Sequence, residues 1–271
     1  MNLRQLTLVG TAACVLAPWT ARGAAATDDD RIAVSADGAT LTGTGGGGGG
    51  SLGWLHNFDA DSLAGAAAEH QALGVARWTF GSLNASLTRG PENQRYSMYA
   101  EAHEGAGNDG LRAFHYSIEA VGIFGTYFHR LSVQIEDKQI DVEGTRGNLP
   151  KVGVAYLWNP HLQTQASYSS SVSGNLGTHL AAARIDEYNA AVNLFGGVAF
   201  GQAAPTIILN FQSGLVQSRY LHEGYVGASK PLPHLRSELT LVADYQNLSG
   251  IKHATLTLNY IFHVGHSGGT Q

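Results

Sequence analysis

The segment Ala254-Thr255-Leu256-Thr257-Leu258-Asn259-Tyr260-Ile261-Phe262 alternates apolar and polar side chains almost without interruption. Ala254, Leu256, Leu258, Tyr260 and Phe262 share one face of an extended chain, whereas Thr255, Thr257 and Asn259 share the other. Because successive side chains of a β-strand point to opposite sides, this period of two predicts a strand with one apolar and one polar face.

The same period recurs upstream, and segments rich in glycine and asparagine separate its repeats. Three further apolar faces are Leu239, Leu241, Ala243 and Tyr245; Leu131, Val133 and Ile135; and Val152, Val154, Tyr156 and Trp158. Turn-forming residues such as Asn247-Leu248-Ser249-Gly250 fall between the repeats. The alanine-rich stretch 61–72 fits either a helix or a strand with small side chains. The pattern predicts an all-β, antiparallel chain.

Composition and aromatic placement favour a membrane barrel over a soluble sandwich. Charged residues are only 14% of the chain, where a soluble domain has about a quarter. Tyr96, Phe124, Trp158 and Tyr260 lie near strand ends, as the aromatic girdles of transmembrane barrels do. Beyond the N-terminal segment no apolar run is long enough for a transmembrane helix. A sheet in lipid must close on itself, because unpaired backbone groups are costly there.

The sequence predicts four regions. Residues 1–26 read as a cleavable signal peptide with cleavage near Ala26. Its Cys14, the only cysteine, leaves a lipoprotein signal as an alternative. Residues 27–50, with the run Gly45–Gly50, are predicted to form a flexible periplasmic leader. Residues 51–262 form the barrel and 263–271 a C-terminal tail. At roughly 9 to 11 residues per membrane strand plus a connection, about 12 strands are expected, with 10 or 14 as alternatives.

These features resemble Gram-negative outer-membrane β-barrel proteins of the porin-like class. The resemblance covers most of residues 51–262 and consists of pattern rather than a diagnostic motif. It implies an up-and-down barrel in the outer membrane, in contact with outer-membrane lipid. It also implies that the barrel assembly machinery recognises the last strand, here through Leu256, Leu258, Tyr260 and Phe262. The nine-residue tail after Phe262 departs from the family's pattern.

Charged residues within predicted strands are the candidates for a hydrated interior. The lumen-facing candidates are Arg77, Glu101, Glu119, Arg130, Glu136, Glu238 and Asp244, to which the same pattern adds Arg112, Lys151 and Arg184. Both signs are present, so the charges can line a pore or pair across it and close it. We expect no cofactor and no metal, although two groups, Glu101 with His103 and Glu104, and His222 with Glu223, have donors that bind metals.

One motif raises the question of catalysis. His115-Tyr116-Ser117 has the spacing of base and nucleophile in outer-membrane phospholipases, but Ile118-Glu119 replace the Asn-Gly that follows in that family. If Tyr116 and Ile118 face lipid, His115 and Ser117 point inward. We therefore expect no enzyme activity, and keep lipid hydrolysis only as an alternative.

The sequence leaves the transported solute open. A channel or export conduit is the leading functional hypothesis, and a structural barrel that anchors a periplasmic partner through its leader is the alternative. The acidic balance, 16 basic against 21 acidic residues, gives no basic patch of the kind that nucleic acid requires.

Overall fold

The computed structural model describes residues 29–42, 45–59, 61–90, 96–108, 113–127, 130–142, 144–172, 178–189, 191–203 and 219–264. The predicted signal peptide and most of the predicted tail lie outside these residues. Among the residues described, no helix is long and apolar enough to cross a membrane.

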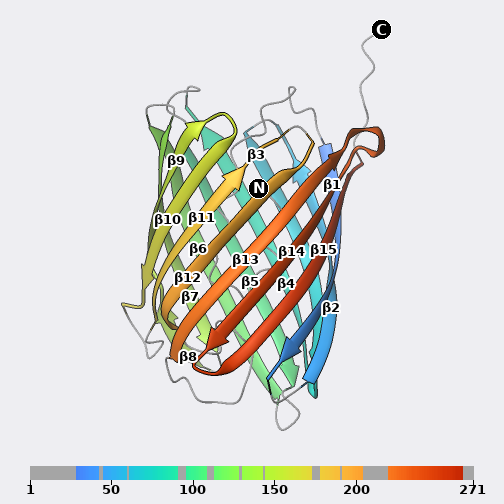
Figure 1. Cartoon of the computed structure of the whole chain (residues 1–271), viewed down its shortest axis with the longest axis vertical. Helices are drawn as coiled ribbons and strands as arrows, with labels where there is room; N and C mark the ends of the chain where they lie inside the picture. Colours follow the sequence, from blue (N-terminus) through green and yellow to red (C-terminus); the bar gives the residue numbers. More distant parts are fainter. Residues whose placement is uncertain are drawn as a thin grey trace.

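The chain forms a closed antiparallel barrel of tilted strands (Figure 1). In chain order the elements are β1 (Asp29–Leu41), β2 (Gly45–Asn57), β3 (Ser62–Leu73), β4 (Ala76–Arg89), β5 (Tyr96–Asn108), β6 (Ala113–Tyr127), β7 (Leu131–Val142), β8 (Thr145–Asn148), β9 (Lys151–Asn159), β10 (Leu162–Ser170), β11 (His179–Glu187), β12 (Asn193–Ala203), β13 (Arg219–Leu232), η2 (Pro233–Leu235), β14 (Ser237–Leu248) and β15 (Ile251–His263).

Within the described ranges, fourteen strands close the wall, because β1 pairs with β15 and β6 pairs with β7. The short strand β8 pairs only with β7 and lies outside this closed cycle. The all-β antiparallel barrel is therefore confirmed. The main expectation of about 12 strands is wrong, and the alternative of 14 fits the wall.

The predicted leader is the source of the miscount. Asp29–Leu41 is β1 and Gly45–Gly50 is the first half of β2, so both lie in the barrel wall. Glycine is a poor strand former on its own, but here β1 and β3 pair with the glycine run on both sides. Closure supplies these partners, and tertiary pairing overrides the local preference. The alanine-rich stretch is likewise a strand, β3.

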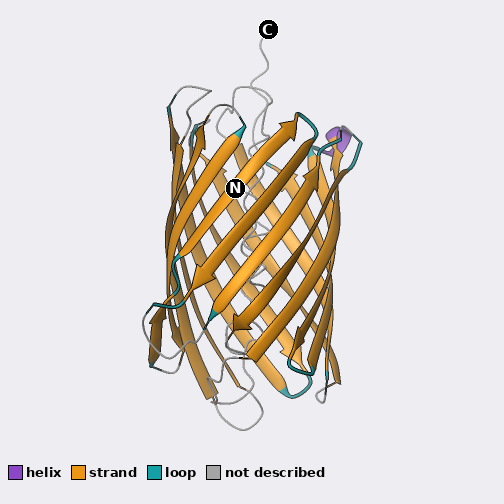
Figure 2. Ribbon diagram, turned by 60° about the vertical axis from the view of Figure 1, so that its left-hand side comes forward, coloured by secondary structure: helices purple, strands orange, loops and turns teal. Residues whose placement is uncertain are grey.

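The two ends of the barrel differ. We call the end where β1 begins and β15 ends the terminal end, and the opposite one the distal end. The turns at 58–61, 160–161 and 233–236 belong to the terminal end, and the two-residue turns 74–75 and 249–250 belong to the distal end. Figure 2, a second view of the barrel, shows the strands running between these two ends.

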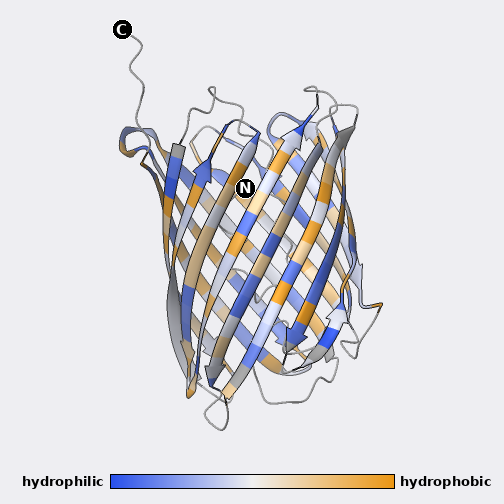
Figure 3. Cartoon of the chain, turned by 180° about the vertical axis from the view of Figure 1, so that it is seen from behind, coloured by the Kyte–Doolittle hydropathy of each residue, from blue (hydrophilic) through white to orange (hydrophobic). Residues whose placement is uncertain are grey.

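Alternation gives the wall an inner and an outer face. Along β4, Trp78, Phe80 and Ser82 are buried inside, whereas Leu83 and Leu87 are exposed outside. Colouring by hydropathy shows polar and apolar positions succeeding one another along the strands (Figure 3). The apolar face of β15 predicted from the sequence points outward, with Leu256 and Leu258 exposed. An exposed apolar band of this kind suits contact with lipid.

The inner wall as the candidate functional site

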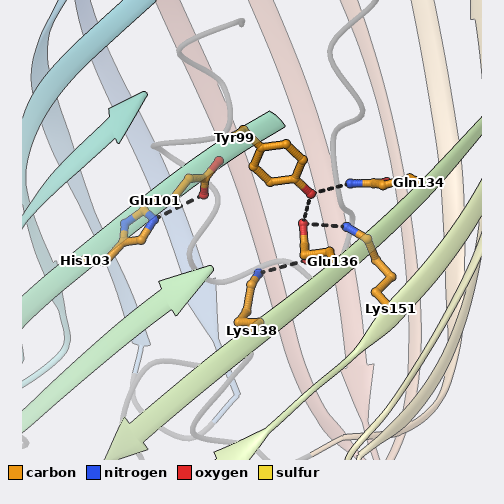
Figure 4. A network of polar contacts seen from close by, with 7 residues as sticks. All are labelled: Tyr99, Glu101, His103, Gln134, Glu136, Lys138 and Lys151. Carbon is orange, nitrogen blue, oxygen red and sulfur yellow. Dashed lines mark hydrogen bonds and ion pairs between the residues drawn. The ribbon is translucent and has the colours of Figure 1, made fainter. Parts of the chain in front are cut away.

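A hydrogen-bonded cluster around Glu136 lies on the inner face of β5, β7 and β9 (Figure 4). Tyr99 donates its hydroxyl hydrogen to Glu136 Oε2 at 2.5 Å, and Gln134 Nε2 donates to the Tyr99 oxygen at 2.6 Å. Lys151 Nζ lies 3.0 Å from Glu136 Oε2, and Lys138 Nζ lies 4.0 Å from Oε1. Because Lys151 is only 3% exposed, its ion pair with Glu136 is shielded from solvent.

A glycine on the neighbouring strand explains how Tyr99 reaches this cluster. Gly122 of β6 pairs directly with Tyr99 of β5. A Cβ on Gly122 would lie 2.3 Å from Tyr99 Cζ, so the ring occupies the space that a side chain would take. The ring therefore lies flat against the wall rather than across the interior. Gly105 and Tyr116 repeat this arrangement six pairs further along the same strands, with the glycine on β5 and the tyrosine on β6.

A second buried ion pair lies on β11. Arg184 donates from Nε to both oxygens of Asp186, at 2.8 and 2.9 Å, and from Nη2 to Oδ1 at 2.5 Å. Gln165 donates to the same carboxylate from β10 at 3.2 Å, and the guanidinium carbon lies 4.9 Å from the centre of the Phe195 ring. The ion pair is therefore held by its own strand and by both neighbouring strands, with β10 contacting the carboxylate and β12 the guanidinium group.

Four inner carboxyl groups have no such basic partner. Glu69 and Asp37 share the side-chain amide of Gln71, which donates to Asp37 at 2.7 Å and to Glu69 at 3.0 Å. Glu223 and Asp244 are buried on the adjacent strands β13 and β14. Within the described residues, no lysine or arginine forms an ion pair with any of these four groups.

Apolar side chains form a collar inside the distal end. We define the apolar collar as the buried cluster Leu41, Leu73, Trp78, Phe80, Tyr116, Ile118, Ile140, Leu149, Leu180, Leu221 and Leu248. Leu41, Leu73 and Leu248 end their strands at the distal end, and Trp78 and Leu221 stand near the start of theirs. The interior is thus apolar at the distal end and polar in its middle.

The structure separates the seven lumen-facing candidates into three groups. Glu101, Glu136, Glu238 and Asp244 lie on the inner face. Arg77 and Glu119 lie instead on the outer face, and Arg130 is exposed in the turn before β7. Of the three added candidates, Lys151 and Arg184 are buried inside, and Arg112 lies outside the described residues.

The two outward charges share a physical cause, which is the apolar collar. Trp78 and Phe80 follow Arg77, and Ile118 precedes Glu119. All three apolar side chains are buried inside the barrel. At the distal end the wall is therefore apolar inside and polar outside, the reverse of its middle. A rule that assigns the apolar residues of a strand to the lipid-facing side therefore predicts the wrong face at the distal end.

The same reversal places His115 and Ser117 on the outer face, so their predicted inward orientation is wrong. Tyr116 is buried inside, whereas His115 and Glu104 of β5 are exposed, with His115 Nε2 3.2 Å from Glu104 Oε1. His115 therefore contacts a carboxylate on the neighbouring strand, and Ser117 stands directly opposite that carboxylate.

The two histidine and carboxylate groups do not assemble as metal sites. His103 Nε2 lies 3.4 Å from Glu101 Oε2 inside the barrel (Figure 4), but Glu104 points outward. His222 is exposed outside, whereas Glu223 is buried inside. In the ranges that the structure describes, no group of three or more histidine, cysteine, aspartate or glutamate side chains is placed to hold a metal ion.

Several inner-wall residues were not predicted from the sequence. Asp37 falls in the supposed leader, and Glu69 in the stretch that fitted a helix as well as a strand. Tyr99 and Gln134 carry no charge that would single them out. Gly122 is the sequence feature that accommodates the Tyr99 ring. The two residues pair only through the register of β5 and β6, which the sequence does not give.

Comparison with known proteins identifies the fold. No protein-family model and no curated protein matches the chain. Among solved structures, it resembles the CymD monoaromatic hydrocarbon channel, with 11% identity, a TM-score of 0.54 and 89% of each chain covered. The Pseudomonas putida toluene transporter TodX gives 11% identity, a TM-score of 0.53, and coverage of 89% of this chain and 91% of TodX.

A Pseudomonas aeruginosa FadL homologue gives 8% identity, a TM-score of 0.52, and coverage of 87% of this chain and 90% of the homologue. At these identities the likeness concerns the fold alone. The chain therefore has the fold of Gram-negative outer-membrane β-barrel channels, and the resemblance inferred from its sequence is confirmed.

Proposed function

We propose that this protein is an outer-membrane channel that passes small solutes through its interior. The observation that carries the proposal is the inner wall, where charged and amide side chains occupy the middle of a closed barrel whose outer face is apolar. Burying a carboxyl group without a basic partner costs free energy. The presence of such groups on the inner wall is therefore explained by a function, and a solute pathway supplies one. The fold shared with hydrocarbon channels supports the same reading.

The proposed orientation puts the terminal end, where β1 begins and β15 ends, in the periplasm. The last strand, β15, pairs with β1 to close the wall and carries Leu256, Leu258, Tyr260 and Phe262 outside. We keep it as the proposed recognition strand for barrel assembly. The anchoring alternative loses most of its supposed tether, because residues 29–41 and 45–50 belong to the wall.

Planar bilayer recording tests the channel directly. The purified, refolded protein should give discrete conductance steps. Trp78→Ala, which removes the largest side chain of the apolar collar, should raise the single-channel conductance because it enlarges the space inside that collar. Leu83→Ala on the outer face of the same strand is the matched control and should leave the conductance unchanged.

A barrel that is folded but electrically silent in both its natural and its Trp78→Ala form would refute the channel. Folding is checked independently by heat-modifiable migration, because a closed barrel resists detergent until it is boiled.

A further inference from the structure

The four inner carboxyl groups that have no basic partner among the described residues lie near one level of the wall, on strands between β13 and β3. Barrel strands tilt by roughly 35–45° from the barrel axis. A circle drawn around the wall perpendicular to that axis therefore meets each next strand about one residue away from the register partner of the residue that it met on the strand before. We call residues on such a circle level with one another. Asp37 pairs with Gly49, and Gly49 pairs with Gln71. Gln71 is thus the register partner of Asp37 two strands away. The residue level with Asp37 lies two positions from Gln71, and this residue is Glu69.

The same construction works in the other direction. Asp37 pairs with Thr257, and Thr257 pairs with Val242. Asp244, two positions from Val242, is thus level with Asp37. Glu223 lies diagonally beside Asp244, because Glu223 pairs with Gln246 and Tyr225 with Asp244. We define the acidic arc as Asp37, Glu69, Glu223 and Asp244.

Three carboxyl groups of the arc are almost fully buried, and Asp37 is half-buried. Glu69, Glu223 and Asp244 are 6%, 4% and 7% exposed. Oε2 of Glu69 has no hydrogen-bond partner within the described part of the chain, and Glu223 and Asp244 face each other, with Gln246 beside Glu223. Two neighbouring buried carboxylates repel each other when both are ionised. A positive charge between them removes that repulsion, so the arc is suited to a cation.

The basic side chains at this level stand on the far side of the barrel. Strand β9 is seven strands from β1 in either direction around the ring. By the same tilt of roughly 35–45°, Lys138 and Lys151 come within about one residue of the level of Asp37. Both lysines are engaged by Glu136. Arg31 also lies on β1, but six residues from Asp37 toward the terminal end.

On each strand of the arc, a leucine of the collar lies on the distal side of the acidic residue. Leu221 lies two residues from Glu223, and Leu41, Leu73 and Leu248 lie four residues from Asp37, Glu69 and Asp244 respectively. These four leucines belong to the apolar collar and share the inner face with the carboxyl groups. The collar therefore comes closest to the arc at Glu223, whereas four residues of strand, about 13 Å, separate it from the other three carboxyl groups, with Ala39, Gln71 and Gln246 in between.

We propose that the acidic arc and the leucines above it form a binding site for organic cations, that is, solutes with an ammonium group on an apolar body. This deepens the proposed function, since it names the class of solute the channel selects. The ammonium group would lie against Glu223 and Asp244 or against Asp37 and Glu69. The apolar body would contact the collar. The negative charge of the arc itself disfavours the anionic counterpart.

Binding to the folded full-length barrel in detergent tests the proposal without requiring conduction. Isothermal titration calorimetry with benzyltrimethylammonium should show binding that is stronger than that of neutral benzyl alcohol. The double substitution Glu223→Gln with Asp244→Asn should weaken cation binding on the order of tenfold, since a charge about 7 Å away in water contributes roughly threefold. Benzyl alcohol binding should not change.

The matched control removes two carboxylates from the outer face through Glu104→Gln with Glu119→Gln, and it should retain the natural affinity. Should the first double variant fail to fold, Asp37→Asn with Glu69→Gln tests the other half of the arc.

Equal affinity for benzyltrimethylammonium and benzyl alcohol, or an affinity that both arc variants leave intact, would overturn the proposal. A silent barrel that binds the cation contradicts only the channel, whereas a conducting barrel that does not bind it contradicts only the organic-cation site.

Discussion

The substitution Gly122→Ala tests whether the aromatic ring of Tyr99 depends on the glycine beside it. An alanine methyl group at this position would lie 2.3 Å from Cζ and 2.4 Å from the hydroxyl oxygen of Tyr99. Both distances are far below van der Waals contact, so the ring must move. Movement breaks its hydrogen bonds with Glu136 and Gln134.

The cost follows from those two bonds. A hydrogen bond to a charged group contributes about 1.5–3 kcal/mol and a neutral one about 0.5–1.5 kcal/mol. Gly122→Ala should therefore lower the free energy of unfolding by about 2–4 kcal/mol. Reversible guanidinium unfolding of the refolded barrel in lipid measures this difference.

Gly81→Ala is the matched control. Gly81 lies on the outer face, and its added methyl group would approach nothing nearer than the Ala67 carbonyl oxygen at 3.8 Å, so its cost should stay within about 0.5 kcal/mol. In a Tyr99→Phe background the two hydrogen bonds are already absent, and Gly122→Ala should cost at least about 1 kcal/mol less than in the natural protein. Equal effects of Gly122→Ala and Gly81→Ala, or no dependence on Tyr99, would refute this account of the ring.

Three other predictions concern different parts of the wall. Lys151→Met removes the cation closest to Glu136 and should lower the free energy of unfolding by about 3 kcal/mol in the same guanidinium titration. Adding Glu136→Gln should restore most of that stability, and no recovery in the double variant would contradict the pairing. Leu258→Arg puts a charge on the outer apolar face and should cost about 2–4 kcal/mol, whereas Thr257→Arg, which points inward, should cost less; the reverse order would mean that the faces are misassigned. Ser117→Ala should leave fatty-acid release from phospholipid vesicles at the background of the natural protein, and a loss of measurable hydrolysis would instead revive the lipid hydrolase.

The sequence is informative wherever one strand face meets lipid. From Leu131 to Phe262 the period of two indicates strands, their faces and an antiparallel order, because lipid demands apolar side chains on alternate residues. It also marks Glu101, Glu136, Glu238 and Asp244 as inward residues, which lie among the polar residues of the middle of the wall. For these segments a local pattern is sufficient, since the environment that decides it is the bilayer rather than another part of the chain.

Only the tertiary structure decided the first two strands, the strand number and the faces at the distal end. The run Gly45–Gly50 has no side chains to carry a pattern and becomes a strand because β1 and β3 supply its hydrogen-bond partners. Arg77 and Glu119 face outward because Trp78 and Ile118 pack into a collar contributed by strands far apart in sequence. The acidic arc likewise depends on register across five neighbouring pairs of strands from β13 to β3, and register is a property of the closed barrel that no single segment contains.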